Sequence, residues 1–301
     1  MTSWIFVVTC ILSSFGLLGN GFVIYFIAVR KRLHSSTNAF IASLAVADFC
    51  VGFFTIPFTC VRKDFSGYHN SRILASSHYF LFYSSACNLC VVTADRFVAV
   101  ALPLRYVTLM TWRRVRRFIL SAWAVPFVVC FLPFTWIFSS STETRNICDK
   151  FFIAFLLTFF EFLPCVVMVA ATWRVLCISH RHTRRTMAIK SQLQFNHPWL
   201  NFDGLRQHRE RNMSSAKLIS VVVGLFLLCY IIEMTSSFLH LLNLSKESWS
   251  SYIRNDVRFL FLVANSAVNP LVYAFLKRDI RTEFERCVCR SRSQSSLISL
   301  R

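Results

Sequence analysis

The chain has few acidic residues, few glycines and few prolines. Only 14 of its 301 residues are Asp or Glu, against 33 Lys and Arg, and there are 7 glycines and 7 prolines. Charged residues make up 16% of the sequence, whereas hydrophobic residues make up 55% and the mean hydropathy is +0.52. Soluble domains of this size need more polar surface, so the composition predicts a membrane protein.

The sequence also lacks the motifs of several catalytic and binding classes. It contains neither His-Glu-x-x-His nor Gly-x-Gly-Asp, no cysteine spacing typical of a zinc site, and no visible internal repeat. An intramembrane enzyme is therefore not predicted, and the absence of paired halves with interrupted helices argues against a transporter. The basic residues form no stripe with aromatic residues apart from the loops, so no nucleic-acid partner is expected.

What the sequence does contain is a series of apolar blocks of membrane-spanning length. Seven are predicted, at about 4–29, 39–61, 73–98, 118–138, 151–176, 216–242 and 257–276. Residues 1–276 are therefore expected to form an all-α membrane protein, a bundle of seven transmembrane helices that lies in the lipid bilayer. Between the fifth and sixth blocks, residues 178–213 are polar and lack a steady period, which predicts a partly flexible loop.

Basic residues beside the apolar blocks set the expected orientation. Most of the 33 Lys and Arg fall between alternate blocks and after the last one. Because positively charged loops stay in the cytoplasm, the amino terminus is expected outside and the carboxyl terminus inside, in a multi-pass protein of the plasma membrane. The first apolar run has no basic leader and is longer than a signal-peptide core, which favours a retained first span.

Residues 277–301 are predicted to form a short amphipathic helix and a cytoplasmic tail. Leu276, Ile280 and Phe284 recur every four residues among lysines and arginines. Apolar residues at this spacing with basic neighbours are typical of a helix that lies on the inner leaflet.

Three positions are candidates for covalent modification. Cys287 and Cys289 follow the amphipathic segment and are candidate palmitoylation sites, the alternative being two unmodified thiols. Asn243 opens an Asn-Leu-Ser sequon in a predicted outer loop, which makes it a candidate glycosylation site.

Polar groups inside the apolar blocks carry the most specific signal. Lipid offers them no hydrogen-bond partners, so they are expected to face protein or water. In chain order they and their neighbours are Gly19-Asn20, Leu44-Ala45-Val46-Ala47-Asp48, Asp95-Arg96-Phe97, Trp123, Pro164 and Asn269-Pro270-Leu271-Val272-Tyr273. In kind and order they resemble the rhodopsin-like (class A) G-protein-coupled receptors over almost the whole chain, loosely nearest the amine-receptor branch.

This resemblance implies a receptor, not an enzyme, that converts binding of an extracellular ligand into activation of an intracellular heterotrimeric G protein. It implies no obligatory cofactor. Arrestin is a further expected partner, through phosphorylated serines between Ser291 and Ser299. The alternative is a receptor-like protein that pairs with another chain without signalling. It is kept open because several family positions are altered, namely Ser71, Thr172, Asn212, Tyr230 and Ile232.

Asp48 is a carboxylate at mid-membrane depth, where it needs partners or an ion. In the resembled family this acid holds a sodium ion together with polar groups of the third and seventh helices. The matching residues here are Ser85, Asn265, Ser266 and Asn269. Oxygen ligands suit such a hard cation. The alternative is a hydrogen-bonded polar cluster without a bound ion.

Asp95 and Arg96 close the third block at the inner surface. The resemblance makes Arg96 the pivot of activation, latched at rest and released toward the G protein, although it could also be an ordinary basic residue at the membrane edge. Two family partners are replaced, an acid by Asn212 and a tyrosine by Thr172. Leu104 lies where the family places a hydrophobic contact with the G protein, or it is simply a surface leucine.

The resemblance assigns further activation residues to the sixth and seventh blocks. They are Phe226, Asn269, Pro270 and Tyr273. The family's Cys-Trp-x-Pro reads Cys229-Tyr230-Ile231-Ile232 here, so Tyr230 takes the place of the ligand-sensing tryptophan. Because the proline is missing, the sixth helix is expected to kink less.

The predicted ligand site comprises His78, Phe82, Tyr230 and Glu233. His78 stands where amine receptors carry an aspartate, and Glu233 follows Tyr230 by nearly one helical turn. We expect Glu233 with His78 to anchor a cationic or hydrogen-bonding ligand, with Phe82 as pocket wall. His78 could instead be a satisfied interior histidine. Glu161, a second carboxylate in the outer half, could face a neighbouring helix or be protonated.

The family's disulfide between the third helix and the second outer loop is altered. Its third-helix position is Ser71, which leaves Cys148 without the usual partner. Cys60 and Cys10 are the alternative partners, and sequence does not decide between them.

Overall fold

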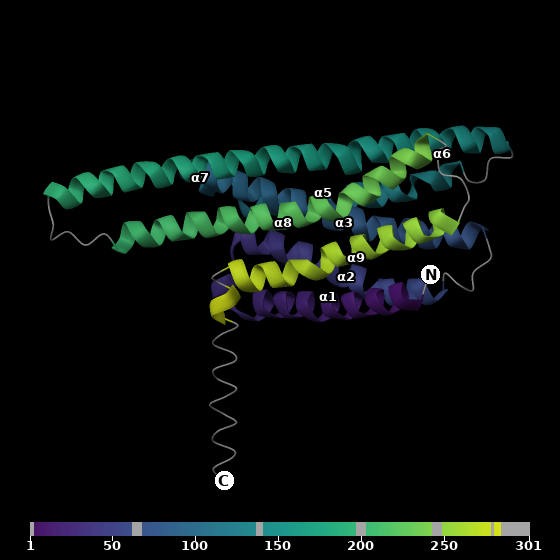
Figure 1. Ribbon diagram of the computed structural model, residues 1–301, viewed down its shortest axis with the longest axis horizontal. Helices are drawn as coiled ribbons and strands as arrows, with labels where there is room; N and C mark the ends of the chain where they lie inside the picture. The colour runs from purple at the N-terminus through teal and green to yellow at the C-terminus, as the bar shows by residue number, and fades with distance from the viewer. Residues whose placement is uncertain are drawn as a thin grey trace, which may run out of the picture.

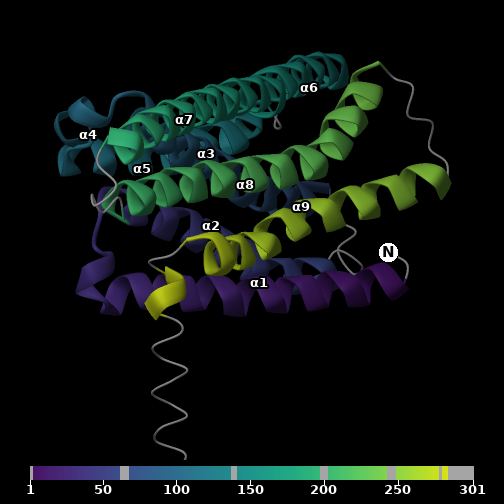
Figure 2. The same ribbon diagram turned by 60° about the vertical axis from the view of Figure 1, so that its left-hand side comes forward.

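The computed structural model describes residues 3–61, 68–136, 141–196, 203–242, 249–277 and 280–283. Within these ranges every regular element is a helix, which confirms the predicted all-α class. The longer helices lie side by side along one direction (Figures 1 and 2). They are α1 (Ser3–Val29), α2 (Ser36–Val61), α3 (Tyr68–Ala101), α5 (Trp112–Phe131), α6 (Thr142–Leu156), α7 (Leu163–Asn196), α8 (Asp203–Leu241) and α9 (Trp249–Leu276).

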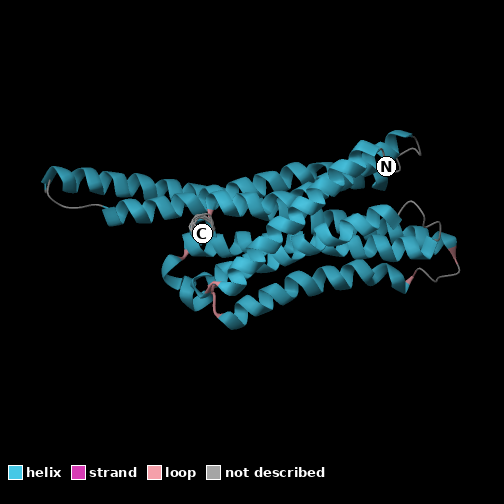
Figure 3. Cartoon of the chain, turned by 90° about the horizontal axis from the view of Figure 1, so that it is seen from below, coloured by secondary structure: helices cyan, strands magenta, loops and turns pink. Residues whose placement is uncertain are grey.

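Short elements join or extend these helices. They are η1 (Lys31–Leu33), α4 (Pro103–Leu109), η2 (Leu132–Thr135) and the π-helix η3 (Leu157–Phe162). The view from below, coloured by secondary structure, shows the described part of the chain as helices with brief connections (Figure 3). Residues 280–283 add one helical turn after α9, at the place of the predicted amphipathic helix.

The order of packing closes the helices into a bundle. α1 lies against α2 and α9, and α8 lies against α7 and α9. α3 packs on α2, α5, α7 and α8, and therefore runs through the middle. Six helical stretches in the described ranges are long and apolar enough to cross a membrane, and a shorter apolar stretch runs over Phe259–Tyr273.

The surface of the bundle is apolar and part of its interior is polar. On α1 the exposed side chains include Ile11, Leu18 and Phe22, whereas Thr9 and Asn20 are completely buried. This is the reverse of a water-soluble helix, because lipid rather than water surrounds the outer face. The polar groups predicted to avoid lipid accordingly point inward.

Two glycines allow α1 to approach its neighbours closely. A Cβ atom on Gly19 would lie 2.8 Å from Cβ of Pro270 in α9. A Cβ atom on Gly52 of α2 would lie 2.9 Å from the carbonyl oxygen of Ser13 in α1. Both separations are below any normal contact, so these helices are held at a distance that only glycine permits.

The inner ends of α7 and α8 correct one prediction. Residues 178–213 were expected to form a partly flexible loop, but α7 continues to Asn196 and α8 begins at Asp203 (Figure 1). The loop prediction is therefore wrong over most of its length. The prediction rested on the absence of an apolar period in this part of the sequence. A helix that does not pack on a core along its length, however, needs no apolar stripe. On α7 the side chains of Met187, Ile189 and Phe195 are exposed.

α8 bends although it lacks the family's proline. It contains no proline between Asp203 and Leu241, and less kinking was expected. Figures 1 and 2 nevertheless show α8 changing direction toward the end that leads to α9. A proline, which lacks a backbone N–H donor, is therefore not the cause of this bend.

The π-helix η3 precedes Pro164, which has no backbone N–H to donate to the preceding turn. A π-helical turn contains more residues than an α-helical turn, so the side-chain directions shift at this point. Within this irregular turn the consecutive residues Phe160 and Glu161 are both buried. The irregular turn thus places a carboxylate inside the bundle.

Candidate functional site

The centre of the bundle holds a completely buried carboxylate, Asp48 of α2. The hydroxyl of Ser85 in α3 donates a hydrogen bond to Oδ1 of Asp48 at 2.6 Å, and Nδ2 of Asn269 in α9 donates to Oδ2 at 2.7 Å. Ser266 and Asn265, the other predicted members of this cluster, are also buried. Three helices are therefore joined through one acid.

The oxygen atoms around Asp48 fit the predicted sodium ion. The carboxylate of Asp48 and the hydroxyl of Ser85 already lie together, and carboxylate and hydroxyl oxygens are ligands that a hard cation prefers. A bound sodium ion would supply a positive charge to a carboxylate far from water. The residues that would hold it are Asp48, Ser85, Asn265, Ser266 and Asn269, and without it the two hydrogen bonds stabilise the acid.

Other residues that match the family's motifs also join helices. Nδ2 of Asn20 in α1 donates to the carbonyl oxygen of Ser266 in α9 at 3.2 Å. Trp123 of α5 donates from Nε1 to the hydroxyl of Ser43 in α2 at 3.1 Å, and Ser43 donates to Asn88 of α3 at 2.6 Å. Each of these polar groups lies between helices, which explains why it sits in an otherwise apolar block.

The inner end of α3 carries a second polar network, built on Asp95 and Arg96. Arg96 donates to Oδ2 of Asp95 from Nη2 at 2.6 Å and from Nε at 3.0 Å. The Thr37 hydroxyl of α2 donates to the same oxygen at 3.0 Å, and Arg96 also contacts Thr37. The hydroxyl of Tyr106 in α4 donates to Oδ1 of Asp95 at 2.7 Å. Arg96 is thus latched to its neighbour, and that neighbour is tied to α2 and α4.

Tyr106 stays a proton donor over the physiological pH range. Burial, followed by the nearby carboxylate of Asp95, raises the pKa of the Tyr106 phenol above its ordinary value, against a lowering from the Thr37 hydrogen bond. Sequence analysis missed both Thr37 and Tyr106. Thr37 lies 58 residues from Asp95 along the chain and Tyr106 lies 11 residues from it, and a single threonine or tyrosine near a loop carries no distinguishing signal.

Two buried hydroxyl groups near the inner side contribute no hydrogen bond. Within the described residues, neither Oγ1 of Thr172 in α7 nor the hydroxyl of Tyr273 in α9 has a hydrogen-bond partner. A buried polar group without a partner costs about 1–3 kcal/mol, so either hydroxyl gains from a rearrangement that supplies one. The side chain of Asn212, the other altered family position, lies outside the described side chains.

The outer half of the bundle brings together most of the predicted ligand residues. Tyr230 of α8 is 2% exposed, stacks on Phe226 with ring centres 4.0 Å apart, and donates to the carbonyl oxygen of Phe82 at 3.4 Å. Phe226 is fully buried. Tyr230 thus links α8 to the middle of α3, where the family carries its tryptophan.

His78 is held among aromatic rings on the α2 and α9 side of α3. Its imidazole stacks on Phe58 at 4.2 Å and on Phe259 at 5.0 Å, and meets Phe82 edge-on at 5.0 Å. Nε2 of His78 is 3.4 Å from Oγ1 of Thr55. The ring is therefore a packed interior group as well as a candidate anchor.

Two buried carboxylates face the space between α3, η3 and α8. Oε1 of Glu161 in η3 accepts hydrogen bonds from Tyr83 of α3 at 3.2 Å and from Ser237 of α8 at 3.3 Å. Glu233 of α8 is 3% exposed, and both acids lie close enough to Tyr83 and Tyr230 to interact with them electrostatically. Glu161 bridges neighbouring helices, one of the two alternatives that the sequence left open.

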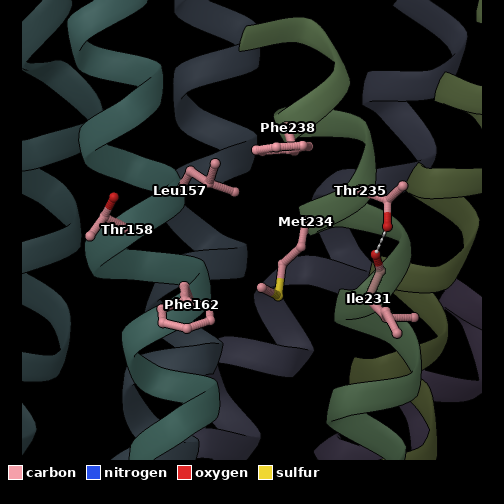
Figure 4. A pocket seen from close by; sticks show the side chains of 7 residues that line it. All are labelled: Leu157, Thr158, Phe162, Ile231, Met234, Thr235 and Phe238. Carbon is pink, nitrogen blue, oxygen red and sulfur yellow. Dashed lines mark hydrogen bonds between the residues drawn. The ribbon is translucent and has the colours of Figure 1, made fainter. Parts of the chain in front are cut away.

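A lipid-facing cavity lies on the other side of this bridge. It has a volume of about 400 Å³ and is formed between η3 and α8 (Figure 4). Figure 4 shows Leu157, Thr158 and Phe162 of η3 opposite Met234 and Phe238 of α8. Thr158 donates to its own helix, at the carbonyl oxygen of Ala154, so the cavity presents an apolar lining.

Several predicted positions are exposed, free or outside the described residues. Leu104 of α4 is 96% exposed. Cys10, Cys60 and Cys148 are all free thiols, so the structure forms neither of the alternative disulfides. Asn243, Cys287, Cys289 and the serines from 291 to 299 lie outside the described residues.

Comparisons with known proteins agree with this architecture. The family described as "7 transmembrane receptor (rhodopsin family)" matches residues 19–273. The chain is similar to adenosine receptor A2b of Bos taurus, with 29% identity over 93% of this chain and 87% of the relative. It is also similar to the histamine H2 receptor of Cavia porcellus, with 28% identity over 90% of this chain and 75% of the relative. The alpha-1A adrenergic receptor of Homo sapiens is 25% identical over 93% of this chain and 67% of the relative.

The fold and the buried polar clusters define a seven-helix membrane receptor rather than an enzyme. The chain belongs to the rhodopsin family of seven-transmembrane receptors. The predicted class A membership, with its loose placement near the amine-receptor branch, is therefore confirmed, and the protein is a multi-pass membrane receptor of the G-protein-coupled class.

Proposed function

We propose that the protein is a plasma-membrane receptor that binds a small cationic or hydrogen-bonding molecule in the outer half of the bundle. Its amino terminus lies outside the cell and its carboxyl terminus inside. Ligand binding changes the packing of α3 and α8, and a heterotrimeric G protein reads this change at the inner end. The relatives named for adenosine and histamine support a small-molecule ligand.

The observation that carries the proposal is the pair of carboxylates, Glu161 and Glu233. A carboxylate in the interior of a membrane protein is costly and is retained where it has a function. Tyr83 and Ser237 contribute neutral hydroxyls to the same region. A ligand with an ammonium group or several N–H donors complements two acids and two hydroxyls. Glu233 is the primary anchor, and His78, Phe82 and Tyr230 form the remaining wall.

Continuous packing supports transmission from the outer half to the inner end. Tyr230 stacks on Phe226 and bonds to α3 at Phe82, so a ligand that moves Tyr230 also moves α8. From His78 to Arg96, α3 spans about 27 Å at 1.5 Å per residue. Asp48 ties the same stretch of α3 to α9 through Ser85. Asn269, Pro270 and Tyr273 follow on α9.

The inner end of the bundle carries the residues that respond to ligand binding. Arg96 is held by Asp95, and the resulting ion pair is joined to Thr37 and Tyr106 rather than to a described residue of α8. Breaking this latch frees a guanidinium that can donate to backbone carbonyls of the G protein. Leu104, exposed beside the latch, supplies an apolar contact. Arrestin would bind the same face after phosphorylation of serines in the tail.

Two modifications accompany this topology. Palmitoylation of Cys287 and Cys289 would hold the amphipathic segment on the inner leaflet. Glycosylation of Asn243 requires the loop before α9 to be outside the cell. Glycosidase treatment should increase the gel mobility of the wild type but not of Asn243→Gln, whereas an unchanged mobility of the wild type would contradict glycosylation at Asn243.

The ligand proposal is tested by a small-molecule screen with a G-protein readout that accepts many receptors. Glu233→Gln keeps the size of the side chain and removes its charge. Active cationic ligands should lose at least about tenfold in potency, because a charge-assisted hydrogen bond is worth about 1.5–3 kcal/mol. Glu143→Gln, an exposed position at the start of α6, is the control and should leave potency unchanged. Equal potency on Glu233→Gln and wild type would remove Glu233 from the site.

A further inference from the structure

The first turn of α2 contacts three other segments at the inner end of the bundle. The hydroxyl of Ser36 donates to the carbonyl oxygen of Met110, between α4 and α5, at 3.3 Å. The hydroxyl of Thr37 donates to Oδ2 of Asp95 in α3 at 3.0 Å. Asn38 accepts a hydrogen bond from the residue that follows α9. Consecutive helical side chains point about 100° apart, so three of them reach three different neighbours.

Asn38 is held in one orientation by contacts at both ends of its amide. The side chain is 2% exposed. Its Nδ2 donates to the carbonyl oxygen of Leu33, the last residue of η1, at 2.7 Å. Its Oδ1 accepts a hydrogen bond from the ammonium of Lys277. A hydrogen bond from a charged donor is stronger than one between neutral groups, so the buried amide binds Lys277 firmly.

Lys277 is in turn fixed to the inner end of α9. Its backbone N–H donates to the carbonyl oxygen of Tyr273 at 3.0 Å, which continues the helical pattern one residue beyond the end of α9. Tyr273 and the nearby Asn269 and Pro270 are the α9 residues assigned to activation. A movement of this end of α9 therefore carries Lys277 with it. Asn38 then either follows the ammonium or loses the contact.

A second contact ties the segment after α9 to α1 rather than to α2. Nε of Arg30, the residue that follows α1, lies 3.6 Å from Oε2 of Glu283. Glu283 is buried. The turn that carries Glu283 lies beside the inner end of α1 (Figure 2). This ion pair holds the same segment through a different helix and therefore offers a matched comparison with the contact between Lys277 and Asn38.

We propose that Asn38 and Lys277 are positioning residues that couple the inner end of α9 to the latch at Arg96. Thr37 precedes Asn38 on the same helical turn and contacts both Asp95 and Arg96. A shift of Lys277 that displaces this turn therefore also displaces the hydroxyl that holds the latch. This role rests on the proposed function, because it presupposes that a G protein responds to the release of Arg96.

The coupling is distinct from the polar centre at Asp48. Asp48 joins α2, α3 and α9 at a point about 15 Å from Asn38 along α2, at 1.5 Å per residue. The contact between Lys277 and Asn38 instead links α9 to α2 directly beside the latch. We therefore expect its loss to loosen the latch and to raise the activity of the receptor without ligand, while the polar centre stays intact.

The coupling is tested by basal nucleotide exchange in lipid vesicles, on a heterotrimer that the wild type activates. Lys277→Met keeps the length of the side chain and removes the donor. It should raise basal exchange at least about threefold, since only part of the contribution of a charged hydrogen bond reaches the latch. Asn38→Leu removes the same contact from the other side and should act alike. Lys277→Arg keeps a cationic donor and should stay within about twofold of the wild type.

A double-mutant cycle shows whether Lys277 acts through Thr37. Thr37→Val keeps the shape of the side chain and removes its hydroxyl. If Lys277 acts through this hydroxyl, the double variant should match the basal exchange of Thr37→Val within about twofold. Independent effects would multiply instead, as a merely structural role of Lys277 predicts. Glu283→Gln, which weakens the ion pair with Arg30, is the matched control and should change basal exchange by less than about twofold.

Four results in this assay would overturn the coupling. The first two are wild-type exchange by both Lys277→Met and Asn38→Leu, and equal activity of Lys277→Met and Lys277→Arg. The others are multiplied effects of Lys277→Met and Thr37→Val, and an increase in Glu283→Gln as large as in Lys277→Met.

The proposed function fails separately, if the wild type activates no heterotrimer. Thermal unfolding of Lys277→Met, Thr37→Val and the double variant then decides the coupling without a G protein. Their Tm shifts should depart from additivity by at least about 2 °C, whereas additive shifts would overturn the coupling.

Discussion

Replacing Asp48 by asparagine tests the polar centre of the bundle most sharply. In the wild type, Asp48 accepts hydrogen bonds of 2.6 Å from Ser85 and 2.7 Å from Asn269. Asparagine has nearly the same volume and keeps an oxygen acceptor for Ser85. Its amide nitrogen would meet Nδ2 of Asn269, a donor against a donor, unless the Asn269 amide turns over. The substitution therefore removes the negative charge with little change in packing.

Two opposing terms set the size of the effect on stability. Weakening hydrogen bonds to a charged acceptor costs about 1.5–3 kcal/mol for each bond lost. Removing a buried carboxylate relieves a desolvation penalty of several kcal/mol. We therefore expect Asp48→Asn without sodium to be neutral or more stable than the wild type by about 1–3 kcal/mol, since uncharged replacements of buried ion pairs are often neutral or stabilising by about 1–4 kcal/mol.

Sodium ions should make the wild type more stable than Asp48→Asn. An ion bound only to the folded state at 100 times its dissociation constant adds about 2.7 kcal/mol to the stability of the wild type. It adds nothing to a variant without the carboxylate. For a chain of this length the wild type should gain roughly 5 °C or more in Tm, taking about 2–4 °C per kcal/mol.

The assay is thermal unfolding of the purified protein in sodium chloride and in choline chloride at equal ionic strength. Matching the ionic strength separates binding of sodium from general screening. Ser85→Ala, which removes one oxygen ligand, should show an intermediate shift. A full sodium-dependent shift in Asp48→Asn would refute the assignment of the ion to this cluster, and no shift in the wild type would refute the sodium site altogether.

Three further outcomes follow from the described contacts. Gly19→Ala places a Cβ atom 2.8 Å from Pro270 and should lower the free energy of unfolding by about 1–3 kcal/mol in the same thermal assay. Gly224→Ala is the control, because its new Cβ atom would meet nothing within 4 Å, and it should be neutral or stabilising. Tyr106→Phe removes the 2.7 Å hydrogen bond to Asp95 and should raise basal nucleotide exchange severalfold; an unchanged basal rate would exclude Tyr106 from the latch. Because the pKa of Tyr106 is raised, the phenol keeps its proton over the physiological range, so Tyr106→Phe should not alter the pH dependence of exchange between pH 6 and 9.

The sequence predicted best those features that the membrane itself imposes. Polar groups such as Asn20, Asp48 and Asn269 stand out in apolar blocks because lipid cannot satisfy them, and each is buried between helices. Their order along the chain was enough to predict the family. The helices differ in their bounds from the predicted spans; α5, for example, begins at Trp112, before the predicted start of its block.

The sequence predicted less well those features that depend on pairing between distant elements. Thr37 and Tyr106 complete the network of Asp95, but only the packing of α2 and α4 beside α3 reveals this. The bridge from Glu161 to Ser237 joins the π-helical turn η3 to α8, which lies far along the chain. Neither feature produces a periodic pattern in the sequence.

Nucleotide exchange on purified heterotrimeric G proteins tests the central claim most directly, namely that this bundle signals through the latch at Arg96. The receptor and Arg96→Ala are each reconstituted in lipid vesicles at equal density, and GTP uptake is followed with a panel of heterotrimers. The wild type should accelerate exchange on at least one heterotrimer, and the acceleration should be stronger after addition of a ligand from the screen. Arg96→Ala should not accelerate exchange. Equal acceleration by the two proteins would contradict the role of Arg96, and no acceleration by the wild type on any heterotrimer would indicate a receptor-like chain that does not signal.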